Sequence, residues 1–216
     1  MKNYIELSWH QDALEKLAAH LNSFREQRPL LYEHLGNVME PKQVNPKAGE
    51  MLFNPQRVID KSYYIYEGFV IILKEIENQG RQVLSIYKKD SIVSSDSFEA
   101  REASGLYLYA TPGARLLEVT YQQMREVYST FPETHELAKL ILGYWHKKEL
   151  EMRAILNKEA LIVVEWFYIN YPEFLTRYHK LLADPELSTF LLIKEKTLKL
   201  ARTKLLKAGR IKWFIR

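Results

Sequence analysis

The sequence predicts an α+β protein, with an N-terminal antiparallel β-roll and flanking helices, then a long helix, then a C-terminal helix-turn-helix domain. Two observations predict this arrangement. Short runs rich in β-branched and aromatic residues alternate with turn signals over residues 44–120, and the chain on either side carries apolar residues at helical spacing. Basic side chains collect at the C-terminal end, which indicates a separate module there.

The composition limits what the chain can be. Its 216 residues, 47% of them hydrophobic, suffice for one large core or two smaller ones. We expect the β-roll domain in residues 1–130, the long helix in 131–156 and the helix-turn-helix domain in 157–216. The absence of cysteine excludes disulfides, thiolate nucleophiles and zinc fingers. There is no signal-peptide pattern and no run of about 18 apolar residues, so we expect a cytoplasmic protein with no membrane partner.

The first elements follow from spacing and turn residues. A helix is expected over residues 8–24, because Ser8 is a good N-cap and Leu14, Leu17 and Leu21 follow at helical spacing. The strands expected after it are short and separated by glycine and proline turns, as in a small antiparallel roll. They cover residues 47–53, 62–66, 69–73, 82–87, 106–110 and 116–120.

The pattern becomes helical again after residue 120. A short helix is expected at 121–128 and a long one at 132–156, whose apolar residues fall on one face near heptad spacing. This face could pack on the roll, on a second copy of the helix, or on both, and the spacing leaves these alternatives open. The stripe consists of Leu137, Ile141, Tyr144, Met152 and Ile155, and Lys148 interrupts it.

The C-terminal residues predict a helix-turn-helix. Residues 157–170 are expected to form a helix, and Asp184 followed by Pro185 has the pattern of an N-cap and first helical position that start another. Residues 193–195 separate this helix from a last one that ends near Gly209. Two short helices joined by a few residues form a helix-turn-helix.

The charges point to nucleic acid as the partner of this domain. Residues 157–216 hold 12 Lys and Arg against 6 Asp and Glu, a net charge of +6, whereas the rest of the chain holds 19 against 21, a net charge of −2. In the last helix Lys194, Leu198, Ala201 and Leu205 share one face, which is expected to be core, and the opposite face would meet a major groove. The predicted DNA contacts are Lys194, Lys196, Thr197, Lys199, Arg202, Thr203, Lys204 and Lys207.

Leu200 lies in the middle of that outward face. A leucine there removes a hydrogen-bond donor that base recognition normally uses, but it can touch thymine methyl groups. It can also pack against a protein partner. Both interpretations are open at the level of the sequence.

Short motifs also occur in a characteristic order. Two segments are similar to motifs in the β-roll of one known protein family. They are Lys-Ala-Gly-Glu at 47–50, similar to Lys-x-Gly-Glu, and Tyr-Tyr-Ile-Tyr-Glu-Gly at 63–68, similar to Tyr-x-Ile-x-x-Gly. Residues 190–202 are similar to Tyr-Leu-Gly-Ile-Thr-Pro-Glu-Thr-Leu-Ser-Arg-Ile-Arg, a helix-turn-helix pattern. The coinciding residues are Leu191, Ile193, Thr197, Leu198 and Arg202. Over nearly its whole length the chain thus resembles the CRP/FNR family of bacterial transcription regulators, in particular the divergent branch common in Bacteroidetes.

The resemblance implies a sequence-specific, dimeric regulator and not an enzyme. It implies a cyclic-nucleotide-binding-like sensor roll (jelly roll), a long dimerisation helix and a winged-helix-like DNA-binding domain. The implied partners are double-stranded DNA and a second copy of the chain, with RNA polymerase as a further candidate. The dimer interface would use Leu137, Ile141, Tyr144, Lys148, Met152 and Ile155.

Three departures from the family pattern leave an alternative. The turn glycine is replaced by Leu192, the usual helix-start residues by Lys194 and Glu195, and an arginine of the recognition face by Leu200. A degenerate family member that acts as a ligand-sensing or protein-interaction module, without operator recognition, would fit these changes.

The effector site departs further. Cyclic-nucleotide binders of the family have a Gly-Glu-Leu turn and, about ten residues later, an arginine on the cyclic phosphate, and the ungapped equivalents here are serines. We expect no binding of cyclic AMP, because its phosphate charge would be under-compensated. An unidentified small molecule remains the candidate effector, and neither a cofactor nor a metal site is predicted. The candidate effector residues are Ser94, Ser95, Arg101 and Ser104.

Overall fold

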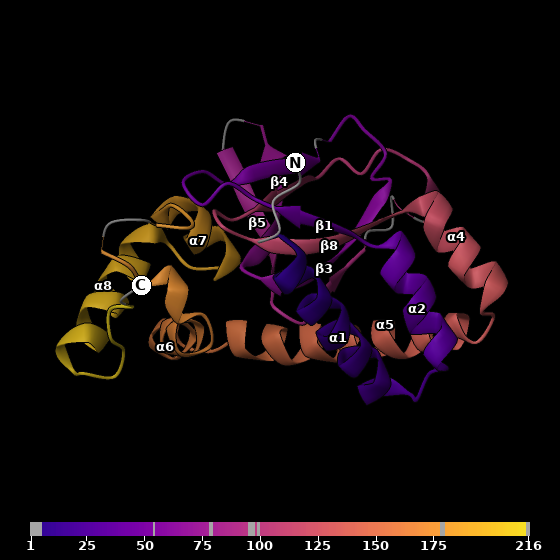
Figure 1. The fold of residues 1–216 in the computed structure, drawn as a ribbon. Coiled ribbons are helices and arrows are strands. Elements are labelled where there is room, and N and C mark those ends of the chain that lie inside the picture. Colours follow the sequence, from indigo (N-terminus) through magenta and orange to yellow (C-terminus); the bar gives the residue numbers. More distant parts are fainter. Residues whose placement is uncertain are drawn as a thin grey trace. The chain divides into compact units, whose positions relative to one another are not determined.

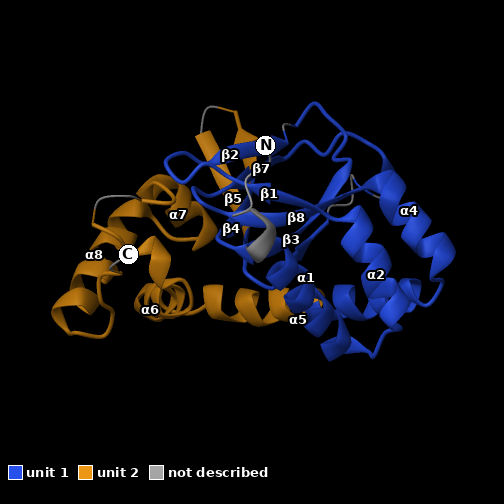
Figure 2. Cartoon of the chain, in the orientation of Figure 1, with its two compact units in different colours: residues 1–72, 86–144 blue, residues 73–85, 145–216 orange. Residues whose placement is uncertain are grey.

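The structure is a computed structural model, and it describes residues 6–53, 55–77, 80–94, 98, 100–177 and 180–214. The chain divides into two compact units (Figure 2). The first unit comprises residues 1–72 and 86–144, and the second comprises residues 73–85 and 145–216. The predicted division at residues 130 and 156 stays a prediction.

The strands form two four-stranded antiparallel sheets (Figure 1). One has the order β1-β8-β3-β6 and the other β2-β7-β4-β5. The six predicted strands are all present. Two further strands, β1 and β6, were not predicted. The bounds are β1 Glu40–Gln43, β2 Glu50–Phe53, β3 Lys61–Glu67, β4 Phe69–Ile76, β5 Gly80–Lys88, β6 Ile92–Val93, β7 Tyr107–Ala110 and β8 Arg115–Thr120.

The two faces of strand β3 belong to different cores. Tyr63 and Ile65 join a cluster that includes Leu108 and Leu116, from both sheets, so this cluster fills the space between them. Tyr64, one residue along the strand, joins the cluster formed with the helices. Because side chains alternate along a strand, one strand supports both cores. It pairs with β8 over most of its length.

Helices cover the outer face of this sheet in the first unit. They are α1 Glu6–Phe24, α2 Pro29–Val38 and α4 Tyr121–Thr130, together with the first turns of α5, which as a whole is Thr134–Leu156. Trp9, Leu31, Val127 and Leu137 all belong to the helical core. Helix α1 begins at Glu6, ahead of the predicted Ser8, and α2 was not predicted.

The second unit contains a helical domain built on α6. Its elements are α6 Ala160–Asn170, the 3-10 turn η1 Pro172–Phe174, α7 Asp184–Phe190 and α8 Glu195–Lys207. Phe167 is fully buried at its centre and meets the rings of Phe174 and Phe190 edge to face, at centroid distances of 5.5 and 5.9 Å. Val164 and Leu198 are fully buried with it. No strand follows α8 in residues 208–214, so the predicted wing is absent from the described part of the chain.

None of the helices in the described ranges is both long and apolar enough to cross a membrane.

Candidate nucleic-acid interface

Helices α7 and α8 are joined by a tight, hydrogen-bonded turn. Helix α7 ends with the Leu192 N–H donating to the Thr189 carbonyl and the Ile193 N–H to the Ser188 carbonyl, the two bonds of a Schellman motif. This motif needs a left-handed residue, and Leu192 supplies it with φ 54°. Glycine is the usual residue there, because a side chain in this conformation is strained. The departure seen in the sequence is therefore accommodated without a change in the turn.

Backbone geometry defines both ends of helix α8. Lys194 is its N-cap residue with extended backbone, and the helix ends in a second Schellman motif. The Gly209 and Arg210 N–H groups donate to the carbonyls of Leu206 and Leu205, and Gly209 takes the left-handed conformation with φ 68°. The predicted end of the helix near Gly209 is confirmed.

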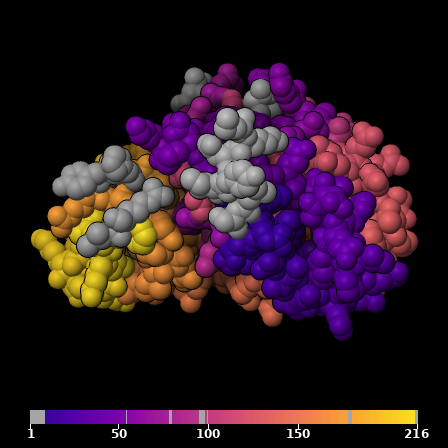
Figure 3. All heavy atoms as spheres, in the orientation of Figure 1, coloured from indigo at the N-terminus to yellow at the C-terminus, as the bar shows by residue number. Residues whose placement is uncertain are grey.

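The outward face of α8 carries exposed lysines around an exposed leucine. Leu198, Ala201 and Leu205 are buried against the domain, as predicted, and Leu200 on the opposite side is 63% exposed. The α8 segment is at the surface in the view of Figure 3, where it is yellow. Six side chains of α8 share the exposed face, namely Lys196, Lys199, Leu200, Thr203, Lys204 and Lys207. Lys194 is exposed at the helix start, and Thr197 is half-buried.

Four of these lysines are free to attract phosphate. Within the described residues, no ion pair involves Lys194, Lys196, Lys204 or Lys207. Lys199 differs, because its ammonium pairs with the Glu195 carboxylate one turn earlier, which raises the pKa of Lys199.

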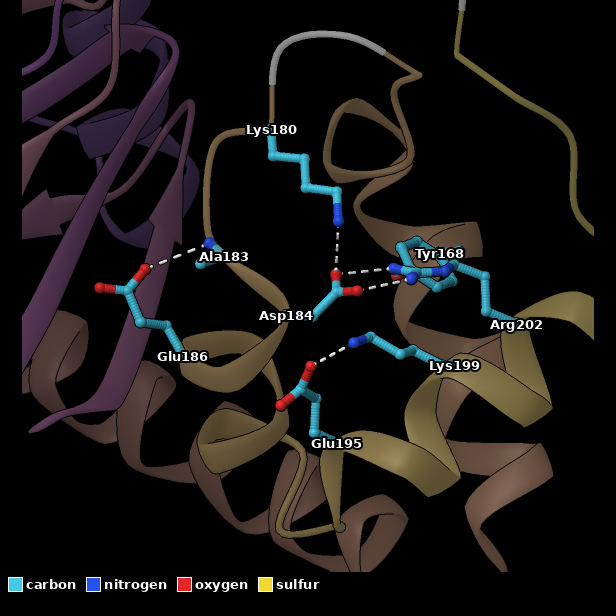
Figure 4. A network of polar contacts seen from close by, with 8 residues as sticks. All are labelled: Tyr168, Lys180, Ala183, Asp184, Glu186, Glu195, Lys199 and Arg202. Atoms are coloured by element: carbon cyan, nitrogen blue, oxygen red, sulfur yellow. Dashed lines mark hydrogen bonds and ion pairs between the residues drawn. The ribbon is translucent and has the colours of Figure 1, made fainter. Parts of the chain in front are cut away.

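Arg202 is held inside the domain and not on the outward face (Figure 4). Its two terminal nitrogens donate to the two oxygens of Asp184 at 2.9 and 2.7 Å, and Nη1 lies 3.2 Å from the Tyr168 hydroxyl. Lys180 donates to the same carboxylate at 3.0 Å. The Arg202 and Asp184 side chains are only 15% and 6% exposed. The expectation that Arg202 contacts DNA therefore does not fit its position, because a bidentate buried pair occupies the guanidinium.

The pair lowers the pKa of Asp184, so its carboxyl stays ionised to low pH in the folded protein. The hydrogen bond from Arg202 lowers the pKa of Asp184 to about 2, and burial opposes this shift only in part. A carboxyl with a lowered pKa contributes stability that is fully present above its unfolded pKa of about 3.9. That contribution is lost as the pH falls toward 2.

Asp184 also begins α7, but not as its N-cap. The N-cap is Ala183, whose N–H donates to the Glu186 carboxylate at 3.1 Å, and Asp184 follows in the first turn (Figure 4). A negative side chain in this turn is favoured by the helix dipole. The predicted helix start is therefore correct to one residue.

Helix α7 makes one further contact in the second unit. The N–H of Val83, in strand β5, donates to the Thr189 hydroxyl at 2.9 Å. A hollow of about 340 Å³ lies beside this contact, and its lining includes Arg81, Leu192 and Lys194. The strand N–H that would otherwise be exposed at the edge of the sheet is thereby satisfied.

The stripe predicted for the dimer interface has contacts within the first unit at its N-terminal end, and its role in pairing stays a prediction. Leu137 is 4% exposed in the helical core, Ile141 packs against that core, and the Tyr144 ring meets Phe24 edge to face at 5.4 Å. Lys148 pairs with Glu151 at 2.9 Å. The remaining two residues, Met152 and Ile155, are half-buried.

A different face of α5 is exposed. Leu142 and Leu150 are 67% and 52% exposed, and His146 lies between them on the same side of the helix. A Cβ added at Gly143 would meet no atom within 4 Å. This row, Leu142, Gly143, His146 and Leu150, was not predicted, because glycine and histidine interrupt it and it lacks the continuous apolar pattern of the stripe at heptad spacing.

The candidate effector residues do not converge on one group. The Arg101 guanidinium lies over the Tyr121 ring, 4.4 Å from its centroid, and the residue is left-handed with φ 61°. The Ser104 hydroxyl bonds to the backbone of Leu106 and so closes a local turn. Ser94 is exposed, and Ser95 lies outside the described residues.

Comparison with known proteins gives similarity in structure only. No family model matches the sequence, and no curated protein is significantly similar to it. Among solved structures, a regulatory protein from Silicibacter pomeroyi matches with a TM-score of 0.64 and 14% identity, over 92% of this chain and 89% of that one. FixK2 from Bradyrhizobium japonicum matches with a TM-score of 0.61 and 15% identity, over 80% and 86%.

The c-di-GMP-responsive global regulator CLP from Xanthomonas campestris also matches, with a TM-score of 0.58 and 14% identity, over 84% of this chain and 93% of that one. These structural neighbours are regulators of the CRP/FNR type. At identities this low, the structural similarity establishes the fold alone. The predicted α+β fold class is confirmed. The assignment to the Bacteroidetes branch stays a prediction.

The Asp184–Arg202 pair should stabilise the domain. Replacing Asp184, as Asp184→Asn, leaves Arg202 buried without its countercharge, and replacing Arg202, as Arg202→Met, leaves Asp184 with Lys180 as its one charged partner in the described residues. We expect each change to cost about 3 kcal/mol in the free energy of unfolding. Urea denaturation followed by circular dichroism measures it. Lys199→Ala is the control, because its pair with Glu195 is exposed and should matter little. An Arg202→Met variant as stable as the wild type would contradict the structural role.

The same variants test the pH dependence. In the wild type, the free energy of unfolding should fall between about pH 5 and pH 2 as Asp184 takes up a proton. The Asp184→Asn protein lacks this group, so its acid limb should be shallower. Equal slopes in both proteins would show that the carboxylate is not protected by Arg202.

Proposed function

We propose that this chain is a dimeric, sequence-specific DNA-binding transcription regulator of the CRP/FNR type. The observation that supports this proposal most is the exposed face of α8, the second helix of the helix-turn-helix. Four lysines there have no ion pair in the described residues. Displacing counterions from phosphate is the chief source of affinity for such a face. The fold, shared with regulators, supports the same conclusion.

The proposed DNA contacts are revised by the geometry. Lys194, Lys196, Lys204 and Lys207 would contact phosphates beside the groove, and Thr203 would face the base edges. Lys199 would contribute less, because Glu195 already neutralises part of its charge. Arg202 would act only indirectly, by holding α8 against α7.

We further propose that two chains pair along α5 through the exposed row of Leu142, Gly143, His146 and Leu150. An exposed apolar row beside a small residue lets two helices approach closely and bury leucine surface. Two linked helix-turn-helix heads could then engage two half-sites at once, with a gain in affinity that needs no new contact. A signal that changes their spacing would regulate DNA binding as a shift in population.

The β-roll would sense a ligand other than cyclic AMP. The only arginine among the candidate effector residues lies over an aromatic ring, and the serine at the position of the family arginine serves its own turn. A doubly esterified phosphate would find no matched guanidinium in this arrangement. We propose no enzymatic activity, and RNA polymerase remains a candidate partner by the same family resemblance.

Removing single lysines should weaken DNA binding in a salt-dependent manner. Lys196→Ala and Lys204→Ala should each make the negative slope of log K against log salt concentration shallower by about one unit, because each loses one phosphate contact. Fluorescence anisotropy with labelled duplex at several salt concentrations measures the slope.

Two controls belong to this series. Lys158→Ala removes an exposed lysine outside α8 and should leave the slope unchanged. Lys199→Ala should change it less than Lys196→Ala does. Slopes equal to that of the wild type in both Lys196→Ala and Lys204→Ala would reject this face as the DNA contact.

Charges placed in the exposed row of α5 should separate the dimer. The double variant Leu142→Glu with Leu150→Glu would bring four carboxylates into an apolar contact, so we expect a monomer by analytical ultracentrifugation. Leu30→Glu, at a 62% exposed leucine of α2, is the control and should leave the mass unchanged. A double variant that still sediments as a dimer would assign pairing to another surface.

Cyclic AMP should not bind. Titration calorimetry of the purified chain should give no saturable heat, because the compensating arginine is missing. A dissociation constant in the micromolar range or tighter would refute this and restore Arg101 as a phosphate ligand.

A further inference from the structure

The outward face of α8 contains few groups that can read bases by hydrogen bonds. Arg202 is bound by both terminal nitrogens to Asp184, and Lys199 is paired with Glu195. The Thr203 hydroxyl donates to the Lys199 carbonyl at 2.9 Å. Arginine, asparagine and glutamine provide most bidentate purine contacts, and none of them is on this face. A lysine ammonium group can donate to guanine, but it is a compact point charge and lacks the fixed donor geometry of a guanidinium.

Leu200 is the group of defined shape at the centre of this face. It is 63% exposed and so adds little to the packing of its own domain. In the major groove, the one base feature that matches an aliphatic side chain is the C5-methyl group of thymine. The position of Leu200 thus suits apolar recognition of one base pair.

The surroundings of Leu200 favour a duplex over an apolar protein surface. Its neighbours one turn before and after are Lys196 and Lys204, both exposed and without an ion pair among the described residues. A protein covering Leu200 would have to bury these ammonium groups or supply carboxylates to them. A DNA duplex supplies phosphates on both sides of the groove while the leucine meets the bases.

We propose that Leu200 is a specificity-determining residue that selects thymine, by packing on its C5-methyl group at the centre of each half-site. This inference rests on the proposed DNA-binding function and adds to it the kind of sequence that is read. The operator would therefore be recognised at this base pair by shape complementarity between two apolar groups, and the lysines would supply most of the affinity.

Exchange of thymine for uracil tests the proposal, because it removes only the methyl group. The full-length chain first selects duplexes from a random pool, and each consensus thymine is then replaced in turn by deoxyuridine. At one position of each half-site the exchange should weaken binding by about fourfold, the effect of losing about one buried methyl group. Binding is measured by anisotropy at fixed salt concentration.

The variants decide which residue is responsible. Leu200→Ala should bind thymine and uracil duplexes equally, with an unchanged salt slope, whereas Leu200→Met should keep the discrimination. Lys196→Ala should weaken both duplexes alike and keep the fourfold ratio. Ile169→Ala, at a 62% exposed isoleucine of α6, is the matched apolar control and should change nothing. Circular dichroism melting verifies that each variant is folded.

The possible failures are distinguishable. If no sequence is enriched over the random pool, the proposed sequence-specific function fails and the inference fails with it. If a consensus emerges but uracil binds as well as thymine at every position, or Leu200→Ala keeps the penalty, the proposed function stands and the inference is overturned. In that case Leu200 is left to a protein partner.

Discussion

The buried pair of Asp184 and Arg202 is the interaction on which the candidate interface depends. It joins the first turn of α7 to the middle of α8, with Tyr168 from α6 as a third member. Three helices of a small domain are thereby tied at one point by charge-assisted, bidentate hydrogen bonds. Such a pair is not required for stability as such, because a well-packed apolar pair could replace it. Its directional geometry, however, fixes the rotation of α8 about its own axis.

That rotation decides which side chains face outward. With Arg202 turned toward Asp184, the opposite side of α8 presents lysines around Leu200. The strongest hydrogen-bond donor of the helix is thus used inside the domain, and point charges and one apolar group are left outside. The turn before α8 keeps the required geometry even with a leucine at the left-handed position. Two of the three departures from the expected pattern, Leu192 and Leu200, are therefore compatible with an intact helix-turn-helix.

Much of this could be predicted from the sequence, and the misses have physical causes. Leu198, Ala201 and Leu205 were assigned to the core correctly, because helical periodicity reports burial directly. Arg202 was misplaced because its partner lies 18 residues earlier, and no local pattern encodes that contact. Strand β1 has the sequence Glu-Pro-Lys-Gln, without any apolar alternation. It forms through backbone pairing with β8, which a hydrophobic pattern does not reveal.

The exposed leucines of α5 and α8 have different charged neighbours, and for this reason we propose different partners for them. Around Leu150, Lys148 pairs with Glu151 and Arg153 with Glu149, so most of the charges on this part of α5 are paired within the helix. An apolar row flanked by internally balanced charges is suited to a second protein surface, which would have to supply no countercharge. Around Leu200, Lys199 pairs with Glu195, but Lys196 and Lys204 have no ion pair among the described residues, and their charge is suited to a polyanion. The proposed assignment therefore rests on the ion pairs beside each leucine and not on its exposure alone.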